Sequence, residues 1–352
     1  MTLIQIDGDY GESGGQIVRT ALALSTISGK PFEVVDIRKG RAEPGLKNQH
    51  LFCIKALEDL CHAKTEGAFL GSTKLSYYPG QIEGKTVSID IGTSGSISLL
   101  LQALLIPSIF SDSKVRLKIT GGTDGKWAMP FDYFNNVFLP HIKKYADIEA
   151  TLIRRGYYPK GGGRVEIKVK PKKEKAKIQL TEEGALIQIK GISHASLDLQ
   201  KGEVAERQAR TARLILNKYN CPVKISSEYS DAFSTGSGIT LWGVFAKDSE
   251  IDFDNPIIVG ADSLGEKGKR AEEVGKEAAN KLIEEIESKA PVDSHLADNL
   301  IPFLALYGGA MKVSKITNHT LTNIYVCEKF FGRIFEVDKT KNMISTISFI
   351  NK

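Results

Sequence analysis

The sequence predicts an α/β (α+β) fold, in which three repeated βαβαββ units form a large domain and a smaller α/β domain is inserted. Three observations predict it. One order of loop, apolar helix, turn and strand recurs three times along the 352 residues. A second helical pattern and strand-like runs follow each occurrence. A stretch before the third occurrence contains strands and helices of its own, which is typical of an insertion.

The recurring order starts at a loop that contains Gly or Asp and ends in a strand. Its three occurrences are 12–38, 92–122 and 294–317. A second helix is predicted after each of them, at 47–63, 129–146 and 319–332. Strands are then predicted at 72–79, 162–171 and 343–350. Strand, helix, strand, helix and two strands is therefore the unit that we expect to repeat.

The period is interrupted by residues 182–287. This stretch contains two strand-like runs and two strongly helical segments, at 185–192, 238–246, 203–219 and 269–288. We therefore expect an inserted α/β domain of residues 182–287, and a large catalytic domain made of residues 1–181 plus 288–352.

The composition is that of a globular protein. Hydrophobic residues make up 41% and charged residues 25% of the chain, which excludes extensive disorder and fibrous repeats. The longest apolar stretch, 97–110, is too short for a membrane span and is interrupted by Gln102 and Pro107. The N-terminus has no basic region followed by an apolar run. We expect no membrane segment and a cytoplasmic location.

The cysteines and the charges indicate which metal sites and partners to expect. The four cysteines show no CxxC spacing, and we expect all of them to be reduced core residues. No His/Cys cluster has metal-ligand spacing, which disfavours structural zinc. The net charge of +5 is compatible with a polyanionic partner. Residues 154–177 hold ten basic residues and two acidic ones, which fits either a lysine-protected edge strand or a nucleic-acid contact.

Gly-rich loops precede two of the predicted helices, GESGG at 11–15 and GTSGS at 92–96. A helix N-terminus offers unpaired N–H donors and a partial positive charge, which suit a phosphate group. Each loop taken alone could also be a simple turn. The polar segment 36–50 adds Arg38, Arg41, Lys47 and Gln49, which could converge on a phosphate or could lie on an exposed basic loop.

Glu12 and Arg19 flank the start of the first predicted helix. A carboxylate beside a phosphate-binding loop is repulsive unless it holds Mg²⁺ or orients a proton-bearing group. The alternative is that Glu12 caps the helix. Gln102 lies inside an apolar helix, where a buried amide needs hydrogen-bond partners.

His319 is predicted at or beside the N-terminus of the helix 319–332, where the helix dipole favours the neutral imidazole. A neutral imidazole is nucleophilic, and the same helix end can hold a phosphate that it attacks. Asp298 could orient the ring or a metal. The alternative is a histidine that only closes the helix end.

The segment RGYYPKGGGRV at 155–165 closely resembles the signature of the RNA 3′-terminal phosphate cyclases. Further matches run along nearly the whole chain: DGDYGESGGQIVRTALALS, RAEPGLKNQH, ITGGTDGKWAMPFD, GADSLGEKGKRAEEVG, HLADNL and NHTLTN. Ser13 is a departure, because the loop usually reads Gly-Glu-Gly-Gly-Gly. A serine is strained there if the position requires a positive φ.

The resemblance implies three βαβαββ units with an inserted domain, an architecture akin to that of enolpyruvyl transferases. It implies ATP-dependent conversion of an RNA 3′-terminal phosphate to a 2′,3′-cyclic phosphodiester through a covalent histidine–AMP, with release of AMP and diphosphate. The implied partners are RNA with a 3′-terminal phosphate, ATP as co-substrate, and a divalent metal, Mg²⁺ or Mn²⁺.

The resemblance also implies a role for each candidate residue. His319 matches the adenylylated nucleophile, and Glu12 matches a residue near the metal and the triphosphate. The residues that match those gripping the RNA phosphate are Arg19, Arg38, Arg41 and Gln49. The residues that match the ATP-binding adenylate pocket are Gln102, Pro130, His295, Leu296, Ala297, Asp298 and Asn299.

Two other functions are compatible with this architecture. One is a catalytically silent cyclase-like protein that acts in ribosomal RNA processing. Such relatives lack the nucleophilic histidine, whereas His319 is present here. The other is enolpyruvyl transfer, which needs no adenylylation of the enzyme.

Overall fold

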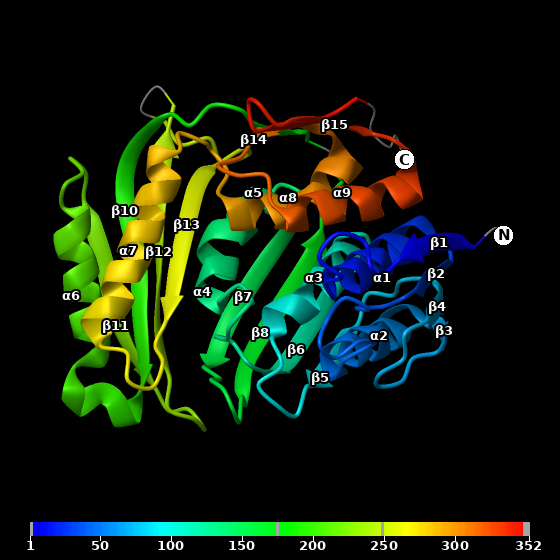
Figure 1. Ribbon diagram of the computed structural model, residues 1–352, viewed down its shortest axis with the longest axis horizontal. Coiled ribbons are helices and arrows are strands. Elements are labelled where there is room, and N and C mark those ends of the chain that lie inside the picture. Colours follow the sequence, from blue (N-terminus) through cyan, green and yellow to red (C-terminus); the bar gives the residue numbers. More distant parts are fainter. Residues whose placement is uncertain (1–2, 174–175, 248–249, 348–352) are drawn as a thin grey trace.

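A computed structural model describes residues 3–173, 176–247 and 250–347. Within these residues the strands form four sheets of four strands each, and the helices lie between and beside them. Figure 1 shows the sheet of the N-terminal segment at the right, the sheet of residues 185–264 at the left, and the C-terminal helices above. The predicted α/β class is confirmed.

The first sheet is built by residues 4–78. Its elements are β1 (Ile4–Asp7), α1 (Gln16–Ser28), β2 (Phe32–Val35), α2 (Asn48–Cys61), β3 (Lys64–Glu66) and β4 (Leu75–Tyr78). The strand order is β1-β2-β4-β3. β1 and β2 are parallel, and the other two pairs are antiparallel.

The second sheet repeats this order with residues 86–171. Its elements are β5 (Thr86–Asp90), α3 (Ile97–Ile109), β6 (Val115–Gly121), α4 (Phe131–Tyr133), the π-helical segment Phe134–Phe138, α5 (Leu139–Ile142), β7 (Ala146–Arg154) and β8 (Gly163–Pro171). The order is β5-β6-β8-β7, with only β5 and β6 parallel.

The third sheet combines one strand from the middle of the chain with the C-terminal segment. Its elements are β9 (Ile178–Leu180), α8 (Ser294–Tyr307), β14 (Gly309–Lys312), α9 (Asn318–Phe331), β15 (Phe335–Asp338) and β16 (Met343–Thr346). Read from β9, the order is β9-β14-β16-β15, with β9 and β14 parallel. The three sheets thus share one strand order and one set of strand directions.

The fourth sheet lies in the chain between β9 and α8. Its elements are β10 (Ala185–Ser196), a 3₁₀ turn (Leu197–Gly202), α6 (Val204–Leu216), β11 (Val223–Ser230), β12 (Ser237–Ala246), β13 (Ile257–Leu264) and α7 (Ala271–Glu287). The order is β11-β10-β12-β13, and α6 packs against α7. The exact domain limits, 182 and 287, stay a prediction.

Four helices from the three repeated segments pack together. α1 contacts both α3 and α9, and α9 contacts α8. α3 is apolar on nearly all sides and nearly all of its residues are buried, as expected of a helix enclosed by other elements. This packing brings together the loops and helix starts that the sequence analysis singled out.

The second predicted helix of the middle segment is shorter than predicted and contains a π-helical stretch. The sequence predicts one helix over 129–146, whereas the structure has α4, a π-helical segment and α5, which ends at Ile142. Pro140 lacks the N–H group that would bond to the residue 136 carbonyl in a regular α-helix, which is consistent with the π-helical stretch directly before it. Residue 146 already belongs to β7. Of the predicted strand 343–350, residues 348–350 lie outside the described residues.

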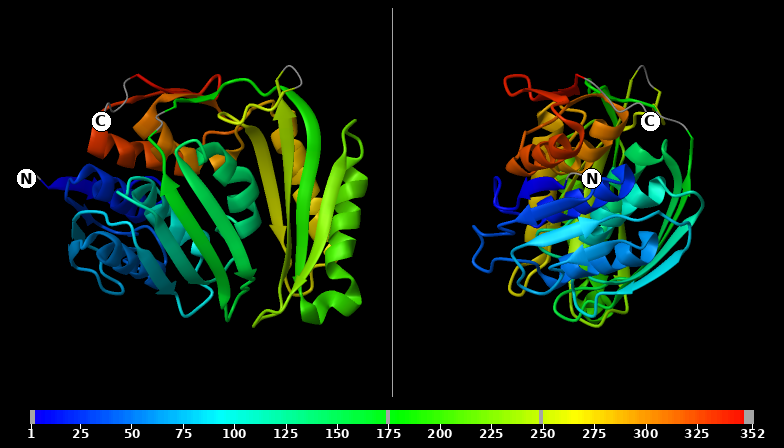
Figure 2. Two further views of the ribbon diagram at one scale, coloured as in Figure 1. Left: turned by 180° about the vertical axis from the view of Figure 1, so that it is seen from behind. Right: turned by 90° about the vertical axis from the view of Figure 1, so that its right-hand side faces the viewer.

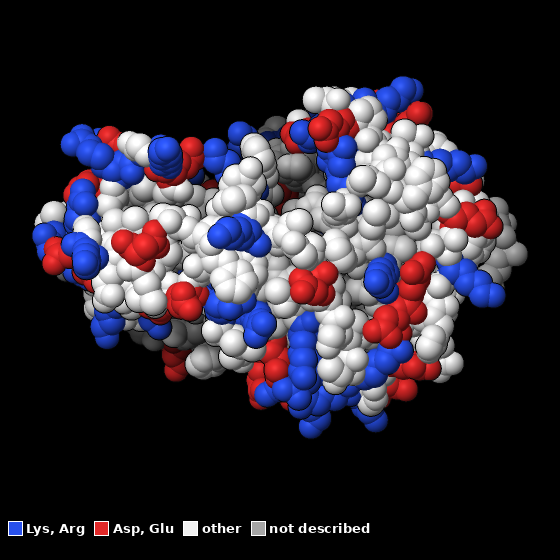
Figure 3. All heavy atoms as spheres, turned by 90° about the horizontal axis from the view of Figure 1, so that it is seen from below, with Lys and Arg blue, Asp and Glu red and all other residues white. Residues whose placement is uncertain are grey.

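The basic segment is not an edge strand. β8 pairs with β6 on one side and β7 on the other. Its buried and exposed residues alternate, so that its basic side chains lie on the face that Figure 2 (left) shows without a helix in front. Lys168 Nζ lies 2.9 Å from Glu149 Oε2 on that face. In Figure 3 the two signs of charge are intermixed, with Lys and Arg densest near the lower margin.

The cysteines are unpaired within the described residues, as predicted. Cys53, Cys61 and Cys327 are buried, but Cys221 is only partly buried, so the expectation of four core residues is wrong for Cys221. None of the helices in the described part of the chain has the length and apolar character that a membrane span needs.

Candidate active site

A cavity of about 650 Å³ lies where the helix starts meet. Residues of α1, α3, α8 and α9 line one part of it, and residues of β13 and α7 line another part. The predicted site residues among its lining are Arg19, Gln102, His295, Asp298, Asn299 and His319. Segments that are far apart in the sequence therefore meet in one concave site.

His319 lies in the first turn of α9, and the start of this helix is fixed by side chains. The hydroxyl of Thr317 accepts a hydrogen bond from the Thr320 N–H at 3.0 Å, as a helix cap does. Asp298 Oδ1 accepts hydrogen bonds from the hydroxyls of Thr317 and Thr320, at 2.8 and 2.6 Å. Asp298 thus holds the helix end on which His319 lies, and burial raises its carboxyl pKa.

The imidazole of His319 lies beside Glu12. His319 Nε2 is 3.4 Å from Glu12 Oε2, and the same oxygen is 3.9 Å from Arg41 Nη2. The carbonyl oxygen of His319 accepts a hydrogen bond from Gln16 Nε2 at 2.6 Å. The His319 and Glu12 side chains are 47% and 39% exposed, so a ligand can reach both of them.

Glu12 does not cap α1. The residue at the N-cap position is Gly15, and no side chain caps this helix. Ser13 has a φ of +51°, so the loop does require the left-handed conformation that favours glycine. The Ser13 hydroxyl bonds to the carboxylate of Asp9, which also accepts the Gly40 N–H at 2.8 Å. Asp9 therefore ties the Gly-rich loop to the arginine-bearing segment.

Arg19 is buried and joins three helices. Its Nε donates to Gln102 Oε1 at 2.8 Å, and Gln102 Nε2 donates to Asn299 Oδ1 at 3.0 Å. Burial lowers the pKa of Arg19 to about 10, so the guanidinium stays charged at neutral pH. The partners that the buried amide of Gln102 requires are thus Arg19 and Asn299.

Two buried donors near Arg19 have no hydrogen-bond partner among the described residues, Arg38 Nε and His50 Nε2. His50 Nδ1 accepts the Lys47 N–H at 2.9 Å, which places the ring proton on Nε2. Nε2 faces the loop at Gly15, where an added Cβ would lie only 2.1 Å from it. Burial, aided by Arg19, Arg38 and Lys47, lowers the pKa of His50 to about 3.

These donors form a candidate site for an anion. Arg38 has a φ of +56°, and burial, with Arg41 nearby, lowers the pKa of its guanidinium. Several positive charges and unpaired buried donors are costly without a negatively charged partner, so the arrangement suits a phosphate group. His50 was not among the predicted site residues. Its position at the end of the polar segment 36–50 was the signal that could have found it.

The other predicted residues are placed less directly. Pro130 is buried at the start of α4, and the residue before it, Met129, lines the cavity. Leu296 and Ala297 are buried in the core between the helices. Gln49 lies partly exposed in the first turn of α2. Their roles stay predictions.

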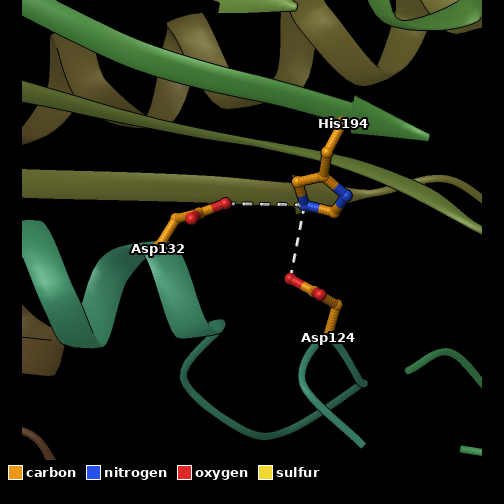
Figure 4. Close-up of side chains that lie close together, drawn as sticks. All are labelled: Asp124, Asp132 and His194. Carbon is orange, nitrogen blue, oxygen red and sulfur yellow. Dashed lines mark ion pairs between the residues drawn. The ribbon is translucent and has the colours of Figure 1, made fainter. Parts of the chain in front are cut away.

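A second group of charged side chains lies between the β5–β8 sheet and the β10–β13 sheet. Arg155 Nη2 is 2.8 Å from Asp132 Oδ2, and Arg155 Nη1 is 3.4 Å from Asp124 Oδ2. His194 Nε2 is 3.3 Å from Asp124 Oδ1 and 4.0 Å from Asp132 Oδ2 (Figure 4). We call Asp124, Asp132, Arg155 and His194 the buried charge cluster.

The buried charge cluster contains residues of the kinds that bind metal ions. Ligand atoms of Asp124, Asp132 and His194 lie within 4.8 Å of one another. The guanidinium of Arg155, however, already supplies positive charge to both carboxylates. The cluster is separate from Glu12, the metal ligand that the sequence suggested.

Comparisons with known proteins agree with the resemblance seen in the sequence. A family model described as RNA 3′-terminal phosphate cyclase matches residues 10–337. A protein named RNA 3′-terminal phosphate cyclase from Pyrococcus furiosus is 46% identical over 336 residues, which are 95% of each chain. Proteins of the same name from Pyrobaculum aerophilum and Archaeoglobus fulgidus are 43% and 41% identical. These two alignments cover 93% and 97% of this chain, and 92% and 100% of the relatives.

Proposed function

The chain belongs to the RNA 3′-terminal phosphate cyclase family, and from this premise we propose that it converts an RNA 3′-terminal phosphate to a 2′,3′-cyclic phosphodiester with ATP as co-substrate. The observation that carries the proposal is that His319 and Arg41 both lie beside Glu12, while the unpartnered Nε2 of His50 faces Gly15 of the same loop. A nucleophile and a phosphate site are what this reaction needs side by side.

In the first step, a ring nitrogen of His319 attacks the α-phosphorus of ATP. A phosphorus–nitrogen bond forms, and the bond from the α-phosphorus to the β-phosphate oxygen breaks, so that diphosphate leaves. Positive charge develops on the imidazole ring as this bond forms. The Glu12 carboxylate, 3.4 Å from Nε2, stabilises that charge. The positive end of α9 faces the phosphate under attack.

The residues around Glu12 fit a divalent ion. Its carboxylate is partly exposed, its nearest cationic group is 3.9 Å away, and a single carboxylate combined with substrate phosphates is a common way to bind Mg²⁺ or Mn²⁺. Bound there, the ion would neutralise charge on the triphosphate and favour the departure of diphosphate. The cavity residues Gln102, His295 and Asn299 are proposed to hold the nucleotide.

In the second step, the RNA 3′-phosphate occupies the anion site made by Arg19, Arg38, Arg41 and His50. One of its oxygens attacks the phosphorus of the histidine–AMP, and the phosphorus–nitrogen bond breaks. The product is an RNA end that carries AMP through a phosphoanhydride, and His319 is free again. The hydrogen bonds from the arginines fix the attacking oxygen beside the helix end.

In the third step, the neighbouring 2′-hydroxyl attacks the 3′-phosphorus. The bond to AMP breaks, AMP leaves, and the hydroxyl proton goes to solvent. A phosphate oxygen without AMP is a poor leaving group, whereas AMP is a good one. The attack is intramolecular, with an effective molarity on the order of 10⁵ M or more. Activation by AMP is therefore the main contribution required of the enzyme.

The test is a product assay. RNA ending in a 3′-phosphate, incubated with the protein, ATP and Mg²⁺ or Mn²⁺, should acquire an end that resists phosphatase, and AMP should be released in equal amount. RNA ending in a 3′-hydroxyl is the control, because it offers no phosphate to adenylylate. Phosphatase-sensitive ends after incubation would contradict the proposal and favour a silent factor in RNA processing.

A further inference from the structure

Trp127 is a large apolar residue that the fold leaves in solvent. It lies between β6 and α4, its side chain is 94% exposed, and its φ is +61°. A bulky residue seldom adopts a positive φ, because its Cβ is crowded in that conformation. Exposure of an indole is a second cost. Neither cost is offset by contacts inside the protein, which suggests that the indole has a ligand.

The position of Trp127 relates it to the candidate active site. Trp127 and its neighbours Lys126 and Met129 line the same cavity as Arg19 and His319. Since the indole is almost wholly accessible, it lies at the rim of this cavity and not in its interior. A ligand that extends from the cavity across this rim can therefore contact Trp127 while its inner end lies near His319.

The loop that carries Trp127 is held at its base. The Phe131 N–H donates to the Thr123 carbonyl at 3.0 Å, which closes the loop. The Ser98 hydroxyl donates to the Met129 carbonyl at 2.6 Å. On the other side, Lys126 Nζ lies 3.0 Å from Glu266 Oε1, which follows β13. The tip is exposed, but its base is fixed to two parts of the molecule.

The buried charge cluster adds a second fixation. Asp124 stands at the start of the loop and Asp132 at its end, and both are ion-paired with Arg155. Figure 4 shows that both carboxylates also point toward His194, which comes from β10. The His194 ring is held in turn, because its Nδ1 lies 2.8 Å from the hydroxyl of Tyr157. Both ends of the loop are thus fastened to one arginine and one histidine.

We propose that this fastened loop presents Trp127 as a stacking platform for a nucleobase at or near the 3′ end of the RNA substrate. The proposal rests on the proposed function. Single-stranded RNA is commonly bound by stacking of bases on aromatic side chains, without selection of a sequence. A platform that is already fixed in place loses little entropy when the base binds.

The exposure of Trp127 favours an RNA base over the adenine of ATP. A small ligand is usually buried over most of its surface. Trp127 instead offers an open face at the rim, which suits a polymer whose remaining nucleotides extend into solvent. The stack would place the 3′-phosphate ahead of the base, toward the arginines and His319.

The two halves of the reaction provide the test. Trp127→Ala should form the covalent enzyme–AMP at the wild-type rate, because ATP does not use the indole. Transfer of AMP from isolated enzyme–AMP to limiting RNA should become about 5- to 150-fold slower, as the loss of one base–aromatic stack predicts. Trp127→Phe should recover most of this loss. Phe253→Ala is a matched control, because Phe253 is 84% exposed and is not part of the cavity lining.

Abasic RNA makes the test specific for stacking. Removing the stacked base from the RNA should slow transfer in the wild type by the same factor, and should cause no further loss in Trp127→Ala. RNA binding should also quench the fluorescence of Trp127, and Trp127→Phe should lack this quenching, since the second tryptophan, Trp242, is only 7% exposed. The quenching is measured without ATP, so it remains informative if no enzyme–AMP forms.

Three results would overturn the platform. Equal slowing of enzyme–AMP formation and of transfer in Trp127→Ala would assign the indole to ATP. AMP transfer to RNA at the wild-type rate in Trp127→Ala would show that the indole does not bind the RNA. Additive losses from the abasic RNA and from Trp127→Ala would show that the two groups do not touch. Failure of the wild type to form enzyme–AMP would instead contradict the proposed function.

Discussion

The candidate active site around His319 and the buried charge cluster are both assembled from distant segments, yet they differ in how their polar groups are satisfied. In the candidate active site, His319 and Glu12 are partly exposed, and Arg38 Nε and His50 Nε2 lack hydrogen-bond partners within the described residues. In the cluster, Arg155 is 3% exposed and pairs with two buried carboxylates. Unpaired donors invite a ligand, whereas charges already paired inside the protein hold the fold.

The difference gives a criterion for separating a reactive site from a structural one. Both places are rich in ionisable groups, so counting such groups does not distinguish them. What distinguishes them is the effect of an added anion. In the candidate active site it would satisfy an unpartnered hydrogen-bond donor, whereas in the buried charge cluster it would disrupt an existing ion pair.

Arg155→Ala should be the most destabilising of these changes. It leaves Asp124 and Asp132 buried without their main cationic partner, at a cost of about 3–5 kcal/mol in the free energy of unfolding. Arg116→Ala is the matched control, because Arg116 also pairs with a carboxylate, that of Glu166, but is 42% exposed, and the change should cost less than about 1 kcal/mol. Urea denaturation measures both values. Equal costs would show that the cluster does not hold the fold.

Arg38→Ala and Arg41→Ala should damage the RNA half of the reaction and spare the ATP half. Loss of a charge-assisted hydrogen bond of about 1.5–3 kcal/mol corresponds to AMP transfer about 10- to 150-fold slower. Lys39→Ala, on the same segment but pointing to solvent near Asp36, should transfer AMP normally. Rates of enzyme–AMP formation and of cyclic-phosphate formation are measured separately. An equal loss in both would place the two arginines on ATP.

His50 should make the folded protein sensitive to acid. Its pKa is about 3 in the folded state, against about 6.5 in the unfolded chain, so the unfolded state binds more protons between these values. The stability due to neutral His50 is present above pH about 6.5 and is lost as the pH falls toward 3. The loss approaches about 1.4 kcal/mol per pH unit.

His50→Gln should therefore lose about 2 kcal/mol less stability than the wild type between pH 7 and pH 5. Urea denaturation at the two pH values measures the difference. His62→Gln is the control, because the His62 side chain is 63% exposed. If His50→Gln and the wild type lose the same stability, His50 is not held neutral by its surroundings.

Inorganic phosphate should stabilise the protein slightly through the anion site. At about 10 mM phosphate and a Kd of about 1 mM, the free energy of unfolding should rise by about 1.4 kcal/mol. Arg38→Ala should lose this gain, and Arg116→Ala should keep it. Chloride at equal ionic strength is the reference. A gain that is equal in both variants would place the phosphate elsewhere.

The local patterns of the sequence were enough to predict the α/β class and to select several residues that the structure brings to one cavity. Glu12 and His319 could be selected because each lies at a predicted loop–helix junction, where helix ends carry known electrostatics. The repeat was the only reason to expect that the fold would bring the two side chains together, with His319 Nε2 3.4 Å from Glu12 Oε2. Ser13 signalled the left-handed loop position by departing from the usual glycine.

Other features depend on tertiary contacts that no local pattern reveals. His50 lies on a predicted helix like many surface histidines, and its isolation among arginines arises only when α2 packs beside α1. The buried charge cluster joins Asp124 and Arg155 to His194, which belongs to a different sheet. Spacing along the chain carries no information about such a group. The π-helical stretch before Pro140, in contrast, has a local cause, because a proline removes one backbone donor from the helix.

The most direct measurement of the chemistry proposed for His319 is mass spectrometry of the protein after incubation with ATP and a divalent metal, without RNA. One AMP should be found on the peptide that contains His319, it should be lost in acid, and it should leave when RNA with a 3′-phosphate is added. Folded His319→Ala should carry none. An AMP group on another residue, or on His319→Ala, would contradict the assignment of the nucleophile.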